Sequence, residues 1–154
     1  MKYFVQEMTN AYARKVLSWR YEPPYDLYNQ EEYAEGLTEL MNGSYLIITD
    51  SFHQLIGFYC TGISAQVPKG HEFSVYDEPY LDFGLGLRPD LTGLGNGQDF
   101  FGFILQHIYG NNLRLTVASF NERAIRLYKN FGFDQVSTFS NGQIEFMTMV
   151  KKVR

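Results

Sequence analysis

The sequence has one cysteine, few histidines and no excess of basic residues, and each shortage excludes a class of protein. Its single cysteine, Cys60, rules out a disulfide within the chain, and we expect it to be a buried structural thiol. The three histidines, His53, His71 and His107, lack the spacing of metal ligands, so we predict no metal site. Thirteen Lys and Arg against 17 Asp and Glu give a net charge of -4, so we expect no nucleic-acid partner.

Long apolar runs are also missing. The longest strongly apolar stretch, Phe100 to Leu105, is far shorter than the ~20 residues of a membrane span, so we expect no membrane partner. Glu7 interrupts the apolar start of the chain before the core of a signal peptide could form, which favours a cytoplasmic location. Aromatic residues, in contrast, are abundant. We expect the 12 Tyr, 13 Phe and one Trp, Trp19, to fill mostly the core.

Hydrophobic periodicity predicts strands and helices in mixed order, within a length of 154 residues that is typical of one domain, residues 1–154. Strands are predicted at residues 3–7, 45–49, 55–61, 81–87, 113–117, 135–139 and 144–150. Helices are predicted from the cap Thr9 to about residue 20, and at residues 31–41, 98–109 and 121–131. Residues 64–79 show no period and are expected to form a long surface connection. This order predicts an α/β (α+β) fold with a mixed sheet.

A glycine-rich segment, residues 92–97, lies between the strand at 81–87 and the next helix. Unpaired backbone N–H groups and the positive end of a helix dipole meet at such a junction, which suits an anion such as a pyrophosphate. The lysine of a Walker loop is missing, and a plain tight turn is the alternative. In the preceding strand, Gly84 and Gly86 leave one face nearly bare. A ligand or another backbone could approach closely there, or the glycines only allow a bend.

A second motif follows about thirty residues later. Asn121, Ala124 and Tyr128 are spaced as N-x-x-A-x-x-x-Y, and a Gly-Phe step follows at residues 132–133. Together the two segments resemble the GNAT superfamily of N-acetyltransferases, whose coenzyme loop has the form Q/R-x-x-G-x-G/A. Thr92 stands where that family has Gln or Arg, which leaves the backbone part of the loop intact.

The resemblance implies a single GNAT-like domain with a mixed, mostly antiparallel central sheet flanked by helices. Its strands at 81–87 and 113–117 would splay apart and form a cleft for acetyl-CoA, which would be the cosubstrate. The pyrophosphate would bind backbone amides of Gly93, Leu94, Gly95, Asn96, Gly97 and Gln98. The pantetheine arm would lie along Leu85, Gly86 and Leu87, almost as an added strand, and would also contact Asn121, which caps its helix.

The same resemblance suggests catalytic residues. A tyrosine that matches Tyr128 often protonates the departing thiolate in this family, and a core tyrosine is the alternative. Relatives that acetylate protein N-termini carry a Glu where this chain has Thr116, which cannot act as a base. Asp82 is the leading substitute as general base, with a solvated strand-edge carboxylate as its alternative. Glu78 and Glu22 are weaker candidates, and water could relay the proton instead.

The connection between the first two helices helps to wall the acceptor site in this superfamily, so Glu22, Tyr25 and Tyr28 are predicted to bind the substrate amine. Acidic side chains around it, Glu22, Asp26, Glu31 and Glu32, favour a small cationic amine or a peptide N-terminus over an anionic sugar nucleotide. Two other functions stay open: a catalytically idle module that senses acetyl-CoA, and a nucleotide-phosphate binder. The sequence leaves the oligomeric state open.

Overall fold

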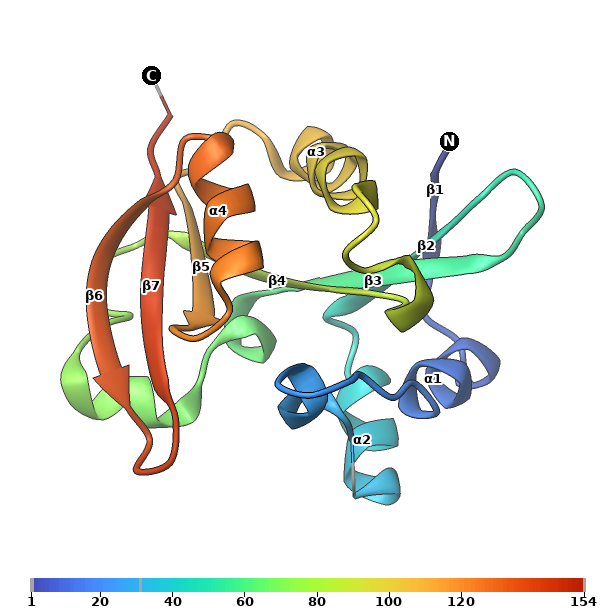
Figure 1. Ribbon diagram of the computed structural model, residues 1–154, viewed down its shortest axis with the longest axis horizontal. Helices are drawn as coiled ribbons and strands as arrows, with labels where there is room; N and C mark the ends of the chain where they lie inside the picture. The colour runs from blue at the N-terminus through green and yellow to red at the C-terminus, as the bar shows by residue number, and fades with distance from the viewer. Residues whose placement is uncertain (1, 31, 154) are drawn as a thin grey trace. The chain divides into compact units, whose positions relative to one another are not determined.

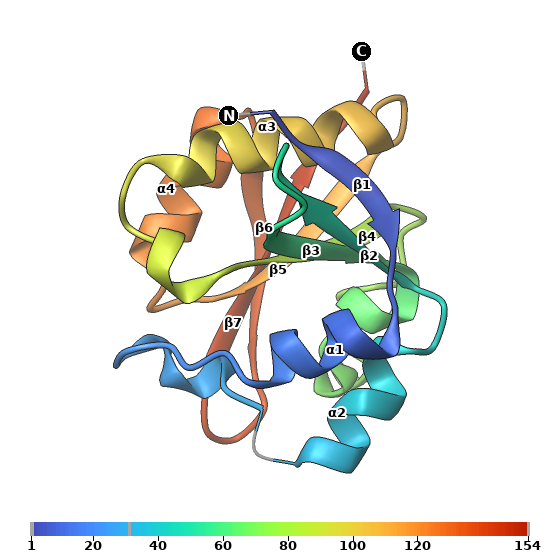
Figure 2. The same ribbon diagram turned by 90° about the vertical axis from the view of Figure 1, so that its right-hand side faces the viewer.

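The structure is a computed structural model that describes residues 2–30 and 32–153 (Figures 1 and 2), so Glu31 lies outside the described residues. The chain divides into two compact units. Unit 1 comprises Met1–Cys60 and Leu85–Ile104, and unit 2 comprises Thr61–Gly84 and Leu105–Arg154. Strand β4 (Leu81–Leu87) and helix α3 (Asn96–Ile108) each run from one unit into the other. The expectation of a single domain stays a prediction.

Seven strands are hydrogen-bonded in the order β1-β2-β3-β4-β5-β7-β6. An antiparallel meander is formed by β1 (Phe4–Glu7), β2 (Tyr45–Thr49) and β3 (Leu55–Thr61). Strand β4 pairs in parallel with β5 (Leu113–Ala118), which is antiparallel to β7 (Glu145–Lys151), and β7 is antiparallel to β6 (Asp134–Ser140). The predicted mixed, mostly antiparallel sheet is therefore confirmed.

In unit 1, two short helices pack against each other beside the meander (Figure 2). Helix α1 (Asn10–Leu17) begins at the predicted cap, because the hydroxyl of Thr9 accepts from the N–H of Tyr12. It ends before residue 20, and helix α2 (Tyr33–Leu40) follows a 3-10 turn, η1 (Tyr25–Tyr28). Ala13, Leu17 and Leu40 form the buried contact between α1 and α2.

In unit 2, helix α4 (Glu122–Asn130) covers one face of β5, β7 and β6, and two 3-10 helices cover the other (Figures 1 and 2). These are η2 (Gly62–Ala65) and η3 (Pro68–Phe73). The surface connection expected at 64–79 contains η3 and the end of η2 and is mostly exposed, but Gly70 and Tyr76 within it are buried. A Cβ on Gly70 would lie 2.6 Å from the Tyr76 ring and 3.1 Å from Phe139 on β6, so this segment packs on the sheet.

The ends of α4 follow the predicted signals. The side-chain oxygen of Asn121 accepts from the N–H of Ala124 at 3.2 Å and caps the first turn. Gly132, with φ +92, follows the last turn in the left-handed conformation. Among the described residues, none of the helices combines the length and the hydropathy of a membrane span.

Candidate active site

The glycine loop of unit 1 lies between a short 3-10 turn, η4 (Pro89–Leu91), and α3. Gly93 and Gly95 have φ of +73 and +85, and a Cβ on Gly95 would meet nothing within 4 Å. Left-handed residues next to right-handed ones turn successive N–H groups toward one side, and the first N–H groups of a helix have no partner within it. The two left-handed glycines and the open space beside Gly95 agree with the predicted anion loop, and anion binding stays a prediction.

Two side chains of this loop donate hydrogen bonds to the backbone of the preceding turn, η4. The hydroxyl of Thr92 donates to the carbonyl of Pro89 at 2.7 Å, and the side-chain amide of Asn96 donates to the carbonyl of Leu91 at 3.1 Å. Thr92 thus has a structural role at the position where the GNAT pattern carries Gln or Arg. Asp99 adds a carboxylate to the first turn of α3, which interacts favourably with the helix dipole.

The end of β4 is anchored to β3 by Arg88. Its N–H donates to the carbonyl of Ile56 at 2.9 Å, and its guanidinium donates to the carbonyl of Leu55 at 2.8 Å. The bare face expected at Gly86 is filled by an aromatic ring, because a Cβ there would lie 2.3 Å from Phe58. The expectation of a ligand on that face of Gly86 is therefore wrong. The backbone of Leu85 to Leu87 stays the predicted partner of the pantetheine arm.

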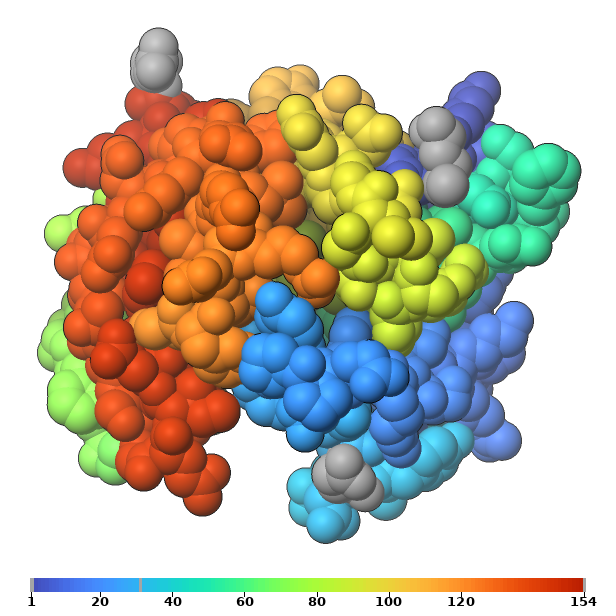
Figure 3. Space-filling model, viewed as in Figure 1, coloured from blue at the N-terminus to red at the C-terminus, as the bar shows by residue number. Residues whose placement is uncertain are grey.

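Residues 21–29, which we call the 21–29 loop, carry the predicted acceptor residues of unit 1. Glu22 and Tyr28 are exposed, and the N–H of Tyr25 donates to the carbonyl of Glu22 at 2.8 Å. Figure 3 shows this segment, in blue, next to the yellow segment that contains the glycine loop. The link between them is Tyr21, whose hydroxyl donates to the carbonyl of Leu87 at 2.7 Å.

Sequence reasoning missed Tyr21. It lies two residues before the Pro23-Pro24 step, where the sequence predicts only a loop, since nothing local indicates which backbone carbonyl a loop tyrosine reaches. The edge of its ring packs against Tyr28, with the centroids 6.3 Å apart. Trp19, expected in the core, is only half-buried and stacks on Phe58 with the centroids 6.1 Å apart.

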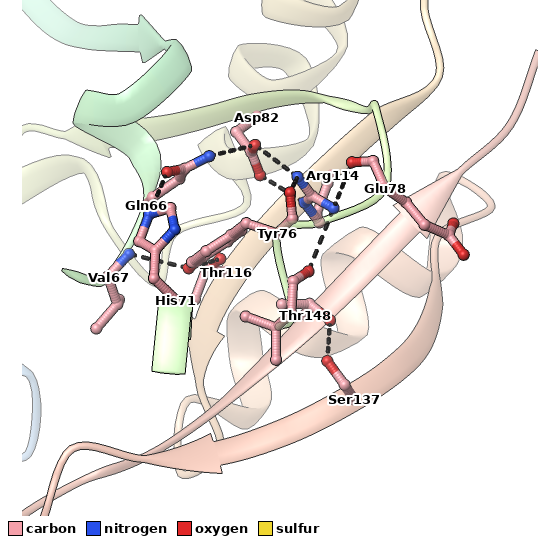
Figure 4. A network of polar contacts seen from close by, with 11 residues as sticks. Gln66, Val67, His71, Tyr76, Glu78, Asp82, Arg114, Thr116, Ser137 and Thr148 are labelled. Atoms are coloured by element: carbon pink, nitrogen blue, oxygen red, sulfur yellow. Dashed lines mark hydrogen bonds and ion pairs between the residues drawn. The ribbon is translucent and has the colours of Figure 1, made fainter. Parts of the chain in front are cut away.

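In unit 2, Asp82 forms a buried ion pair with Arg114 (Figure 4). The Nε of Arg114 donates to one oxygen of Asp82 at 2.7 Å, and a terminal nitrogen donates to the other at 2.8 Å. Gln66 adds a third hydrogen bond to Asp82 at 2.9 Å. Only 4% of Asp82 and 3% of Arg114 is exposed, so the expectation of a solvated strand-edge carboxylate is wrong.

The remaining donors of Arg114 hold the segment before β4. They reach the carbonyls of Val75, Tyr76 and Glu78 at 3.2 to 3.5 Å. The guanidinium also lies over the rings of Tyr76 and Tyr80, 5.1 and 5.2 Å from their centroids. Hydrogen bonding to Asp82 raises the pKa of Arg114 above its usual value. Both oxygens of Asp82 are thus engaged in holding this segment.

Thr116, at the position of the missing base, shares a hydrogen bond of 2.8 Å with the hydroxyl of Tyr76. The same hydroxyl accepts from the N–H of Val67 at 2.9 Å. Burial raises the pKa of Tyr76, which keeps it a neutral hydrogen-bonding group. Next to it, the imidazole of His71 bonds the amide oxygen of Gln66 at 2.8 Å (Figure 4). Of the weaker base candidates, Glu78 offers this network only its backbone carbonyl.

The two other predicted site residues of unit 2 are Asn121, which caps α4, and Tyr128 on α4. The capping role of Asn121 is confirmed, and its contact with pantetheine stays a prediction. Tyr128 is 8% exposed and packs near Phe133, with the ring centroids 6.4 Å apart. Burial is compatible with both roles considered for Tyr128, the acid and the core residue.

Within residues 2–30 and 32–153, no group of three or more His, Cys, Asp or Glu side chains is arranged to hold a metal ion. Cys60 is 4% exposed, as expected of a structural thiol.

No protein-family model and no curated protein sequence matches the chain. Solved structures do match it. A chimera of the spermidine N-acetyltransferase SpeG from Vibrio cholerae and hSSAT has a TM-score of 0.71 at 18% identity, over 97% of this chain and 95% of that one. SpeG from Vibrio cholerae in complex with manganese ions has a TM-score of 0.66 at 17% identity, over 97% and 92%.

A third similar structure comes from another organism. It is a provisionally assigned acetyltransferase from Acinetobacter baylyi ADP1, with a TM-score of 0.65 at 15% identity, over 99% of this chain and 93% of that one. These likenesses cover nearly the whole chain. The chain therefore has the fold of the GNAT N-acetyltransferases, as its two motifs predicted.

Proposed function

We propose that this protein is an acetyl-CoA-dependent N-acetyltransferase that acts on a primary amine. The observation that carries the proposal is the open loop with left-handed Gly93 and Gly95 at the start of α3, in a chain with an acetyltransferase fold. Turn glycines elsewhere, such as Gly142, also have positive φ and open space beside them, so the place of this loop at the start of a helix is what supports a phosphate site. The sequence and the absence of a membrane-spanning helix among the described residues are compatible with a cytoplasmic location, which forms part of the proposal.

The residues present fit the coenzyme. Backbone N–H groups from Gly93 to Gln98 would bind the pyrophosphate, as helix N-termini commonly bind phosphates. The backbone of Leu85 to Leu87 would pair with the pantetheine arm, and Asn121 would contact the same arm. These assignments are based on the family resemblance and on the loop geometry of unit 1.

In the proposed reaction the amine nitrogen attacks the acetyl carbonyl carbon, the new C–N bond forms and the C–S bond breaks. A backbone N–H near Leu85 or Leu87 would stabilise the oxyanion, and Tyr128 would donate a proton to the departing sulfur. The amine loses its proton to water, and Tyr128 regains a proton from water. We do not assign the removal of the amine proton to Asp82, because Arg114 and Gln66 engage both of its oxygens and a protonated Asp82 would leave Arg114 as an unpaired buried charge.

The acceptor we propose is a small cationic amine, with a peptide N-terminus as the second choice. Glu22, Asp26 and Glu32 are exposed in or next to the 21–29 loop, and their charge would attract a cation. The similar structures of spermidine N-acetyltransferases make a polyamine the first acceptor to test.

Calorimetry with acetyl-CoA and with an acetyl-pantetheine fragment tests donor binding. We expect the intact coenzyme to bind and the fragment, which lacks the pyrophosphate, to bind at least about 10-fold more weakly. Neither heat nor a thermal shift with acetyl-CoA would contradict the proposal.

Release of free coenzyme A in the presence of spermidine, an aminoglycoside or a short peptide then tests catalysis. One observation favours a rival function, an idle coenzyme-binding module: the hydroxyl of Thr116 occupies the position of the expected base and is bonded to Tyr76. Binding without turnover of any amine would support this rival. A preferred acceptor with several negative charges would contradict the proposed substrate class.

A further inference from the structure

The last peptide group of β4 shows which edge of this strand is available to a ligand. The N–H of Arg88 donates to the carbonyl of Ile56 on β3 at 2.9 Å. Because a trans peptide is planar, the carbonyl of Leu87 in the same peptide points the opposite way, toward the edge that faces away from β3. In the proposed function, the pantetheine arm would lie along that edge. We call it the coenzyme edge.

The hydroxyl of Tyr21 lies at the coenzyme edge, since it donates to the carbonyl of Leu87 at 2.7 Å. Burial raises the pKa of Tyr21, with Tyr28 as a smaller cause, so the hydroxyl keeps the proton that it donates. This hydrogen bond has the ordinary length for a hydroxyl donor and ties the half-buried tyrosine to the backbone of β4.

Tyr21 is also one end of a closed loop. Its N–H donates to the side-chain oxygen of Asn29 at 2.7 Å, and its ring packs against Tyr28. Between these ends, the N–H of Asn29 donates to the carbonyl of Asp26 at 3.0 Å. The 21–29 loop is therefore tied together at its base, and a displacement of Tyr21 displaces the loop as a whole.

We propose that Tyr21 is a positioning residue of the transferase: its hydroxyl fixes the 21–29 loop to the coenzyme edge of β4, so that coenzyme binding is transmitted to the loop that would hold the amine. This inference rests on the proposed function and adds a residue and a coupling that the family motifs do not contain. The position of the 21–29 loop, and therefore of the amine, would then depend on whether the coenzyme is bound along the coenzyme edge.

The fluorescence of Trp19 can report this coupling. Trp19 is the single tryptophan, lies two residues before Tyr21 and stacks on Phe58 with an interplanar angle of 24°. Its fluorescence depends on that contact and on its partial exposure, so a displacement of the loop changes the emission. This signal can be recorded without turnover, which separates it from the catalytic part of the proposal.

The test compares the wild-type protein with Tyr21→Phe, which removes only the hydroxyl. We expect saturating acetyl-CoA to change the Trp19 emission of the wild type, and the variant to lose about half or more of that change. Calorimetry should give coenzyme Kd values within about 2-fold of each other, while the KM for the amine rises about 3- to 10-fold, the loss of one hydrogen bond. A merely structural tyrosine would lower the Tm and leave the emission change and the amine KM as they are.

Two further variants control for the loop and for the substitution. Asn29→Leu removes the oxygen that accepts from Tyr21 and should behave like Tyr21→Phe, whereas Asn29→Asp keeps the acceptor and should behave like the wild type. Tyr33→Phe, on an exposed tyrosine of α2 in the same unit, should change nothing.

The outcomes separate this inference from the proposed function. If calorimetry shows binding but Trp19 does not respond in the wild type, or responds fully in Tyr21→Phe, the inference is overturned and the proposed function stands. If acetyl-CoA gives neither heat nor a thermal shift, the proposed function fails and the inference fails with it.

Discussion

The polar network of unit 2 and the two loops of unit 1 use their polar groups in opposite ways. In the network, Asp82 and Arg114 are almost completely buried, and the guanidinium donates to one carboxylate and three carbonyls. In the loops, Glu22 is exposed, Leu94 is 71% exposed, and Gly95 has open space beside it. The network is closed on itself, whereas the loops expose charge and backbone to solvent.

The difference separates polar groups that hold the fold together from exposed ones that can meet a ligand. Removing a charge from water is costly, and a buried ion pair recovers that cost only when its hydrogen bonds are complete. A carboxylate in such a pair cannot accept a proton without losing the pair. Asp82, predicted from the sequence as a base because it lies on the sparse face of β4, is therefore better explained as the partner that positions Arg114 and residues 75–80.

A variant that breaks the closed network should lose the most stability. Arg114→Met leaves Asp82 as a buried charge without its cation, which should lower the free energy of unfolding by about 3–5 kcal/mol. Urea denaturation followed by circular dichroism measures it. The matched control is Lys69→Met, which breaks an ion pair of similar length, 2.6 Å against 2.7 Å, whose side chains are 44% and 61% exposed.

For Lys69→Met we expect a change below about 1 kcal/mol, because solvent screens the exposed pair. Equal losses in the two variants would show that the network is not the closed structural element described here.

A second variant tests whether Tyr128, a buried residue of unit 2, also takes part in chemistry. Tyr128→Phe keeps the ring but removes the proposed proton donor, so kcat should fall about 10- to 100-fold when chemistry is rate-limiting. Acetyl transfer to spermidine measures it, with the coenzyme Kd as the control for binding. A fall in stability with unchanged kcat would return Tyr128 to the core and would make the contrast between the two regions sharper.

A smaller effect concerns the open loop of unit 1. Gly95→Val forces a β-branched side chain into a left-handed conformation, at a cost of about 1–2 kcal/mol, and should weaken acetyl-CoA binding about 10-fold. Gly142→Val is the matched control, since Gly142 has φ +98, open space beside it and a place in the β6–β7 hairpin.

Both glycine variants should lose similar stability in a thermal scan, and only Gly95→Val should lose coenzyme affinity in calorimetry. Equal coenzyme affinities would mean that the loop is merely a tight turn.

Local signals predicted much of the fold. The strands at 45–49, 55–61 and 81–87 begin and end where alternation and turn residues placed them, and the caps Thr9 and Asn121 follow from side chains that bond their own helix. The motif that points to the coenzyme loop is equally local, because glycines with positive φ are needed wherever the chain turns in this way. Such features depend on neighbours within a few residues.

The missed features depend on residues far apart in the chain. Asp82 and Arg114 meet only because β4 and β5 pair in parallel with both at the second position, a register that neither strand shows by itself. That shared position was the one available signal. The 3-10 helices before β4 are too short to show a period, so the contact between Tyr76 and Thr116, separated by 40 residues, left no trace in the pattern.

The smallest effect is a pH dependence that distinguishes buried from exposed tyrosines. Burial raises the pKa of Tyr76 above 10, so below about pH 10 its hydroxyl is protonated in both the folded and the unfolded chain and its contribution is fully present. As the pH rises further, the unfolded chain loses this proton first, and the free energy of unfolding falls.

The variant Tyr76→Phe has no such proton, so its free energy of unfolding should fall less steeply with pH. At neutral pH it should be less stable than the wild type by about 1 kcal/mol, because Thr116 and Val67 lose a hydrogen-bond partner. Urea denaturation at several alkaline pH values measures the slopes, with Tyr109→Phe, on a tyrosine that is 81% exposed, as the control that should match the wild type. Parallel curves for all three proteins would mean that Tyr76 is not held neutral by the network and that the closed region of unit 2 admits water as readily as the loops of unit 1.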